Sequence, residues 1–408
     1  MTNGLSLRKT KIINLSTVIK AIYRQGPIDR ASISRLTKLS PTTCTAITKT
    51  LIQHKVVEEV GEGASSGGRK PILLRVNKDY GHLIGVVRSE GSILVTLFNM
   101  GFEVLQEVAV EESGPLLESF NIIIEEVSKI LDANDVNNIL GMTISTHGVV
   151  DTVNQTIVGA SSLKMEEKLS YRGLFEAAFD FPVFIENDSN IVAYGEKRLL
   201  YTNRDSLVHI GVGTGVGAGI VLGDRMIKGR YGYIGEIGHI SMDRNGPHCY
   251  CGNKGCLETM ASLTALYHKI DFGMEAGSAG DLDQWVRRRG KSYDLEGLLK
   301  AADAGNRFAI DLMMEEAELL YQAVICVVNL YDPEVITIGG FGIEFSTYLI
   351  ETIKQKLENT IYKYQLENRT IVASKNDHKS HVVSSALYCL DQLLEENSFS
   401  QSLVDHSS

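Results

Sequence analysis

The two parts of this 408-residue chain carry opposite net charges, and this division limits the folds that the chain can adopt. Residues 1–78 contain 14 Lys and Arg against 4 Asp and Glu, whereas the remainder contains 26 against 46. A basic module attracts the polyanions that an acidic body repels, so we expect two units with separate roles. A basic face that is merely solvated is the alternative interpretation of the charge alone.

The composition excludes fibrous, disordered and membrane-spanning chains. Hydrophobic residues make up 44% of the chain and charged residues 22%, which is ordinary for a globular protein. No apolar run approaches the roughly 18 residues that a membrane-spanning helix requires. The first residues are polar and basic and do not resemble a signal peptide, so we expect a cytoplasmic protein that does not bind membranes.

The basic region begins with two predicted helices. Apolar residues at helical spacing predict a first helix over residues 9–25 and a short second helix over residues 30–37. On the second helix, Ile33 and Leu36 are expected to face inward.

A third predicted helix has a small, polar outer face. Ser40 and Pro41 open it, because serine caps helix N-termini and proline suits the first helical position. The expected buried stripe is Cys44, Ile47 and Leu51, and the expected outer stripe is Thr42, Thr45, Ala46 and Lys49. A short helix, a tight turn and a helix of this kind fit the major groove of DNA.

A glycine-rich loop with a basic tip follows the third helix. Residues 56–60 and 71–76 are predicted strands, and residues 61–70 between them form a wing. Cations would contact phosphates and hydroxyls near the helix start would contact base edges of double-stranded DNA. The expected DNA contacts are Ser40, Thr42, Thr43, Thr45, Lys49, Arg69 and Lys70. A helical dimerisation module is one alternative, and a scaffold whose wing contacts another regulator is a second.

The acidic body has the pattern of an α/β protein with two lobes. Predicted strands lie at 83–88, 92–99, 103–110, 139–145, 207–212, 217–222 and 335–338, with a helix at 116–133. Hairpins followed by alternating helices and strands occur twice, which indicates two packed lobes and a cleft. We place domains at residues 1–80, 81–192 and 193–384, with dimer contacts in the last and a helix at 385–400 packed on the first lobe. The polar segment after Glu396 predicts a frayed tail.

His239 and three nearby cysteines form the strongest chemical signal. Cys249, Cys251 and Cys256 supply three thiolates and His239 an imidazole, which completes a tetrahedral zinc shell. Four protein ligands leave no open position on the ion, so we expect a structural zinc. His248 is a competing ligand, and a chance cluster of free thiols is the alternative.

Short acidic motifs surround a glycine-rich hairpin at residues 211–219. Its glycines let backbone amides approach an anion or a sugar, although it is neither a P-loop nor a dinucleotide fingerprint. The motifs are Glu186-Asn187-Asp188, Gly235-Glu236-Ile237-Gly238-His239 and Cys256-Leu257-Glu258. Carboxylates accept hydrogen bonds from paired hydroxyls, so such groups in a cleft suit a polyol. Each acid taken alone is more often an ordinary surface residue, but two of the motifs flank the cysteine cluster, which favours a shared site.

Together these motifs resemble the ROK family (repressor, open reading frame, kinase), in particular its xylose and N-acetylglucosamine repressors. The resemblance spans nearly the whole chain and rests most on residues 65–71, 211–219, 235–239 and the zinc spacing. It implies an N-terminal winged helix-turn-helix and an actin-like, ribonuclease H-like, two-lobed body of the sugar-kinase type. It also implies a sugar site formed by Asn187, Asp188, Glu236, His239 and Glu258.

The same resemblance implies a sugar-responsive repressor of carbohydrate-utilisation genes. Such a protein would bind a roughly palindromic operator as a homodimer or homotetramer, and a sugar or sugar phosphate would release it. Lys38 stands where relatives often carry glycine in the turn of the helix-turn-helix.

One segment departs from the kinases of this family. Their phosphate-binding Asp-x-Gly-Gly-Thr stretch is replaced here by Val87-Arg88-Ser89-Glu90-Gly91, where Glu90 would repel phosphate. In kinases the residue that matches Asp188 activates a sugar hydroxyl, and here it would be a vestige. We therefore expect no catalytic residue and no enzyme activity. The alternative is an ATP-dependent sugar kinase that also binds DNA.

Overall fold

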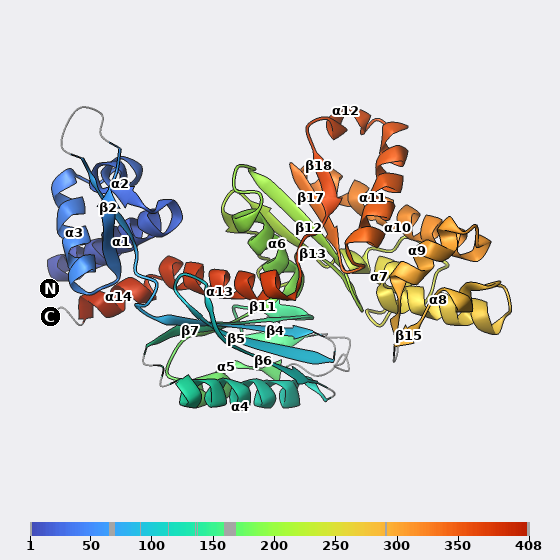
Figure 1. Cartoon of the computed structure of the whole chain (residues 1–408), viewed down its shortest axis with the longest axis horizontal. Helices are drawn as coiled ribbons and strands as arrows, with labels where there is room; N and C mark the ends of the chain where they lie inside the picture. The colour runs from blue at the N-terminus through green and yellow to red at the C-terminus, as the bar shows by residue number, and fades with distance from the viewer. Residues whose placement is uncertain are drawn as a thin grey trace.

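The computed structural model describes residues 2–64, 70–89, 91–112, 114–134, 136, 138–158, 169–289 and 292–405. Within these ranges the chain forms an N-terminal part of small helices and a sheet, followed by two lobes that each contain a larger sheet (Figure 1). No helix among the described residues is long and apolar enough to cross a membrane.

The N-terminal part combines three helices with a small antiparallel sheet of order β1-β3-β2. Its elements are α1 (Thr2–Gln25), β1 (Ile28–Asp29), α2 (Arg30–Thr37), α3 (Pro41–Gln53), β2 (Val57–Glu62) and β3 (Ile72–Val76). Side chains cap α2 and α3, because Asp29 accepts a hydrogen bond from Ser32 N–H at 3.0 Å and Ser40 one from Thr43 N–H at 3.1 Å. Lys38 ends α2 with a left-handed φ of 57°, so the turn forms without a glycine.

Two predictions about these helices were wrong. Leu36 is 57% exposed, whereas Ile33 is fully buried. The helix α2 has only eight residues, and Arg30 ties it to α3 by donating to Thr48 Oγ1 at 3.1 Å. Burial of a narrow stripe around Ile33, together with this hydrogen bond, is therefore enough to hold α2 against the rest of the N-terminal part. In addition, α1 begins at Thr2 and not at residue 9.

The first lobe is built on a mixed five-stranded sheet of order β11-β7-β4-β5-β6. Its elements are β4 (His82–Ser89), β5 (Ser92–Asn99), β6 (Val104–Glu111), α4 (Leu116–Asn134), β7 (Ile139–Thr146), β8 (Val149–Asp151), β9 (Thr156–Val158), β10 (Leu169–Ser170), α5 (Arg172–Ala178) and β11 (Val183–Asn187). Alternate residues of β4 face opposite sides: Leu83 and Val87 pack toward α13 (His378–Glu395), and Ile84 and Val86 toward α4. Helices therefore cover both faces of this sheet (Figure 1).

The second lobe repeats this plan with a five-stranded sheet of order β14-β13-β12-β17-β18. Its strands are β12 (Ser206–Val212), β13 (Val216–Leu222), β14 (Arg225–Met226), β17 (Val335–Gly339) and β18 (Thr370–Ala373), and β15 (Arg288–Arg289) and β16 (Ser292–Tyr293) form a small separate pair. Its helices are η1 (Ile237–His239), α7 (Leu257–Ala261), α8 (Leu263–Glu275), η2 (Leu282–Gln284), α9 (Leu295–Asp303), α10 (Arg307–Tyr331), α11 (Ile343–Glu358) and α12 (Lys363–Leu366).

Two helices lie between the sheets. α6 (Asp188–Leu199) packs on β12 and β13 of the second lobe, and α13 packs on β4 and β7 of the first lobe and on α6. The predicted domain limits stay a prediction. The helix α6 runs across the limit placed between residues 192 and 193.

The C-terminal segment is helical where the sequence suggested a frayed tail. The helix expected at 385–400 is divided into α13, which ends at Glu395, and α14 (Ser398–Asp405). α14 packs against α1, and its Phe399 and Leu403 are buried. This apolar contact explains why the prediction of a frayed tail was wrong.

One apolar cluster joins the N-terminal part to the first lobe. It contains buried residues of α1, such as Val18 and Ile22, together with Leu390 and Leu394 of α13. Ser16 Oγ also donates a hydrogen bond to the Leu394 carbonyl at 2.8 Å. The orientation of α1 is therefore set by the body of the protein.

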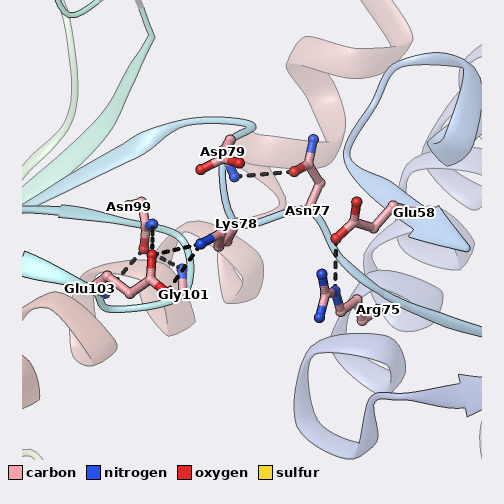
Figure 2. Close-up of polar contacts among 8 residues, drawn as sticks. All are labelled: Glu58, Arg75, Asn77, Lys78, Asp79, Asn99, Gly101 and Glu103. Carbon is pink, nitrogen blue, oxygen red and sulfur yellow. Dashed lines mark hydrogen bonds and ion pairs between the residues drawn. The ribbon is translucent and has the colours of Figure 1, made fainter. Parts of the chain in front are cut away.

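Figure 2 shows the linker that follows β3. Lys78 Nζ pairs with the Glu103 carboxylate of the first lobe at 2.9 Å, and the Asp79 N–H donates to Asn77 Oδ1 at 3.1 Å. Exposed ion pairs of this kind contribute little to stability, so the apolar cluster is the stronger constraint.

Candidate functional site: an interlobe cavity beside a metal-ligand cluster

A cavity of about 1140 Å³ lies between the two lobes. Its walls come from the ends of β7 and β17, the β12–β13 hairpin, the start of α6 and of α13, and the loop around the cysteines. Four of the five predicted sugar-binding residues line it, namely Asn187, Asp188, Glu236 and Glu258. The fifth, His239, is not among the lining residues but adjoins one of them, with 3.8 Å between its Nε2 and the Glu236 carboxylate.

The start of α6 presents two polar side chains to the cavity. Asn187 caps the helix by accepting from Ser189 N–H at 2.9 Å, and its amide donates to the Gly148 carbonyl at 3.1 Å. These bonds occupy much of its hydrogen-bonding capacity, so Asn187 fixes the local backbone. Asp188 follows at the first helical position, where the helix dipole favours a negative charge.

Two further carboxylates face the cavity from the second lobe. Burial raises the pKa of Glu236 to about 7, and the charges of Glu258 and Asp188 act in the same direction. Glu258 accepts a hydrogen bond from Val216 N–H at 3.0 Å. A Cβ at Gly215 would lie 2.5 Å from the Glu258 carboxylate, so this position of the glycine-rich hairpin makes room for a protein side chain.

His239 and the three cysteines form a compact cluster whose ligand atoms all lie within 4.8 Å of one another. Cys249 Sγ is 3.6 Å from His239 Nδ1, and Cys251 Sγ is 3.6 Å from Cys256 Sγ. Bonds of about 2.0–2.3 Å in a tetrahedron separate neighbouring ligands by about 3.5–3.8 Å, so these residues fit a four-coordinate metal ion. The competing ligand His248 is not part of this group.

His381 is a cavity residue that sequence reasoning missed. It reaches the cavity from α13, is half-buried, and its Nε2 lies 2.8 Å from Ser145 Oγ. Burial lowers the pKa of His381 to about 4, and His209 and His378 lower it further, whereas Asp188 acts in the opposite direction. No local pattern marks this residue, because its partners come from distant parts of the chain.

The segment that replaces the kinase phosphate-binding stretch contains a buried ion pair. Val87 packs in the core, and the Arg88 side chain is only 2% exposed. Arg88 Nη2 lies 2.6 Å from the Glu112 carboxylate, and its Nη1 lies 3.0 Å from Nε2 of His147, another cavity residue that the sequence did not indicate. Glu90 lies outside the described residues.

The outer face of α3 is open to solvent. Its exposed residues are Ser40, Thr42, Thr45, Ala46 and Lys49, and Thr43 is half-buried. Thr45 Oγ1 donates to the Pro41 carbonyl of its own helix at 2.8 Å. In the wing, Lys70 is exposed and lies 3.5 Å from Glu62, whereas Arg69 lies outside the described residues.

A model of the ROK family matches residues 84–391. The chain belongs to the ROK family. It is 31% identical over 391 residues to a putative xylose repressor of Caldicellulosiruptor sp. (strain Rt8B.4). This aligned region covers 94% of this chain and 97% of that protein. It is 29% identical to the N-acetylglucosamine repressor of Escherichia coli O157:H7, with 92% of both chains covered. The family resemblance that the sequence predicts is thus confirmed.

Solved structures place this ROK protein in the predicted fold class. A crystal structure of a ROK family transcriptional regulator, a homologue of the E. coli MLC protein, matches with a TM-score of 0.79 and 27% identity over 97% of this chain and 98% of its own. A ROK family glucokinase from Streptomyces griseus matches with a TM-score of 0.62 and 23% identity over 76% of this chain and 100% of its own, which concerns the fold alone. The α/β body of the sugar-kinase type is therefore confirmed.

Proposed function

We propose that this ROK protein is a sugar-responsive transcriptional repressor of carbohydrate-utilisation genes. It binds operator DNA through its N-terminal part, and a sugar or sugar phosphate in the interlobe cavity releases it. The observation that carries the proposal is the union, in one chain, of a helix with an exposed hydroxyl-rich face and a cavity lined by carboxylates. Relatives named xylose repressor and N-acetylglucosamine repressor match this chain over both parts.

In this proposal α3 enters the major groove of double-stranded DNA. Hydroxyls near its start contact base edges, where direct contacts read the sequence. Lysine and arginine side chains contact phosphates, which fix the position of the protein on the duplex. The base contacts are Ser40, Thr42, Thr43 and Thr45, and the phosphate contacts are Lys49, Arg69 and Lys70. A homodimer or homotetramer presents two such helices to half-sites about 34–36 Å apart, or a multiple of that distance.

The sugar site uses the carboxylates as hydrogen-bond acceptors. Asp188, Glu236 and Glu258 accept from sugar hydroxyls, while Asn187 holds the start of α6 in place. His239 contributes through Nε2, since its Nδ1 faces the thiolate of Cys249.

Zinc is the metal that the donor set favours. Three thiolates and one imidazole form a closed tetrahedral shell, which is typical of structural zinc sites. When bound, zinc would supply a crosslink between His239 and the cysteine loop. Since α7 begins directly after Cys256 and carries Glu258, these residues position part of the sugar site.

Two helices provide a physical route from the cavity to the DNA-binding part. α6 starts at Asp188 and α13 carries His381, and both line the cavity at those residues. α13 then reaches α1 at Leu394 through the hydrogen bond from Ser16. A sugar that binds one lobe orientation more tightly shifts the population toward it, and the orientation of α1 changes accordingly.

A sugar kinase is the second candidate. The glucokinase fold and the place of Asp188 at the start of α6 favour it. Against it, the segment that holds nucleotide phosphate in kinases here contributes Arg88 to a buried pair with Glu112, and the buried Val87 stands at the place of the aspartate. We therefore expect no phosphoryl transfer.

Calorimetric titration with free and phosphorylated sugars, with ATP as a separate titrant, tests the proposal first. Operator DNA binding is then measured by fluorescence anisotropy with and without the sugar that binds. Sugar binding without ATP binding, together with release from DNA, is the expected result. ATP binding with sugar turnover would establish the kinase, and DNA binding that no sugar changes would remove the sensor role.

A further inference from the structure

Tyr250 holds a position in the cavity that neither the zinc cluster nor the sugar site explains. It lies between the metal ligands Cys249 and Cys251, lines the cavity and is 45% exposed. Its hydroxyl is 3.1 Å from His239 Nε2, and the two rings meet edge to face with centroids 5.2 Å apart. The Glu258 carboxylate is close enough to the same hydroxyl to act on it electrostatically. The phenol therefore contacts one of the residues proposed to bind sugar and lies near a second.

The direction of these hydrogen bonds follows from the imidazole. His239 Nδ1 points at the cysteine sulfurs, and an imidazole that binds a metal through Nδ1 carries its proton on Nε2. Nε2–H then donates to the Tyr250 oxygen, and the proton of the Tyr250 hydroxyl remains available to the nearby Glu258 carboxylate. A sugar hydroxyl between the same two groups would accept from His239 and donate to Glu258 in the same way.

We propose that the hydroxyl of Tyr250 is a placeholder for a sugar hydroxyl, occupying the place between His239 and Glu258 until a sugar displaces it. This inference rests on the proposed function, because it takes His239 and Glu258 as sugar ligands. Tyr250 is thus a residue that sets the affinity of the sugar site.

The backbone around Tyr250 restricts how the phenol leaves. The thiols on both sides belong to the metal-ligand cluster, so the ring moves by rotating about its own side-chain bonds. The cavity of about 1140 Å³ gives it room to do so. Each sugar molecule then has to displace the phenol from His239 before it forms its own hydrogen bonds, and this competition weakens sugar binding.

The variant Tyr250→Phe tests this inference, because it removes the hydroxyl and keeps the ring. Tyr233→Phe is the matched control, since Tyr233 is 58% exposed and is not among the residues that line the cavity. Wild type and both variants are titrated calorimetrically with D-xylose and with N-acetylglucosamine, and bound zinc is measured in each preparation. We expect Tyr250→Phe to bind the sugar about threefold to tenfold more tightly, with unchanged zinc and an unchanged control.

Whether the sugar affinity of Tyr250→Phe rises or falls relative to wild type separates the outcomes. Weaker sugar binding by Tyr250→Phe would make the hydroxyl a direct sugar contact, and unchanged binding would mean that it does not compete; either result overturns the placeholder. Loss of zinc from this variant would assign the hydroxyl to the metal shell and would overturn it too. If wild type binds neither sugar but a different titrant, the same comparison is made with that titrant. If wild type binds no sugar at all, the proposed function fails first.

Discussion

The interlobe site and the outer face of α3 are built in opposite ways. The interlobe site brings together side chains from at least four separate segments, and Asn187 and Glu258 are hydrogen-bonded to the backbone around them. The face of α3 comes from consecutive turns of one helix, and its Thr45 hydroxyl bonds only within that helix. The first surface is therefore preorganised by the whole fold, and the second is free to adapt to a partner.

This difference has an energetic consequence. Substitutions in the interlobe site remove contacts that also hold the lobes, so they affect both stability and ligand binding. Substitutions on α3 or in the wing remove exposed groups, which typically change stability by less than about 0.5 kcal/mol. The predictions below test that contrast.

The largest effect is expected from the metal-ligand cluster. Cys251→Ala removes one ligand, and we expect loss of bound zinc, loss of the sugar response and a fall of about 4 kcal/mol in the free energy of unfolding. Cys326→Ala is the control, because Cys326 is half-buried on α10 and outside the cluster. Metal analysis and chemical denaturation measure both. Stoichiometric zinc in Cys251→Ala would contradict the ligand assignment.

Acid sensitivity should reside in the interlobe site. The pKa of His381 is lowered from 6.5 to about 4, so the unfolded chain binds a proton before the folded protein does as the pH falls. Through His381 alone, stability is then lost between pH 6.5 and pH 4 by about 1.4 kcal/mol per pH unit, whereas Glu236, whose pKa is raised to about 7, acts in the opposite direction.

The variant His381→Gln should remove this part of the stability loss at low pH, while it keeps a side chain that can form a hydrogen bond with Ser145. Denaturation midpoints of wild type and variant, compared from pH 7 to pH 4, provide the measurement. Parallel pH curves for the two proteins would show that His381 is not buried in its neutral form.

A smaller effect is expected when one carboxylate in the cavity is neutralised. Asp188→Asn weakens the hydrogen bonds to a sugar hydroxyl, and we expect sugar affinity to fall about 10-fold to 100-fold with operator binding in the absence of sugar unchanged. Asp180→Asn, an exposed position in the first lobe, is the control. Calorimetry and anisotropy give the two affinities. A parallel loss of operator binding would mean that the two surfaces are less separate than the structure suggests.

The smallest effect is expected in the wing. Lys70→Ala should weaken binding to all DNA sequences alike and lower the slope of log affinity against log salt by about one unit. Lys300→Ala, on α9 of the second lobe, is the control. Anisotropy titrations at several salt concentrations test this. A changed sequence preference with an unchanged slope would place Lys70 at base edges and not at phosphates.

Features that depend on neighbouring residues could be predicted from the sequence. The Ser40 cap, the stripes of α3 and the spacing of the cysteines are local patterns, and the structure contains each of them. The hairpins and central strands of both lobes also lie where the pattern places them, within a residue or two.

Features that depend on long-range packing could not be predicted in this way. His381 and the Arg88–Glu112 pair acquire their partners only when distant segments meet. Leu36 has the spacing of a buried residue but is exposed, because apolar spacing alone does not reveal how narrow a stripe a short helix buries. In α14 the apolar residues Phe399 and Leu403 do share a helical face, but the polar composition around them concealed that signal.

The packing of α1 against α13 has a consequence for the order in which the protein matures during translation. Ser16 and Leu394 are 378 residues apart, and a ribosome adding about 5–20 residues per second needs about 20–75 s to span that distance. During this time α1 can pack on α2, α3 and β3, but the part of its surface that contacts α13 and α14 has no native partner. The N-terminal part of a nascent chain therefore takes its final position on the body only after nearly the whole chain has been made.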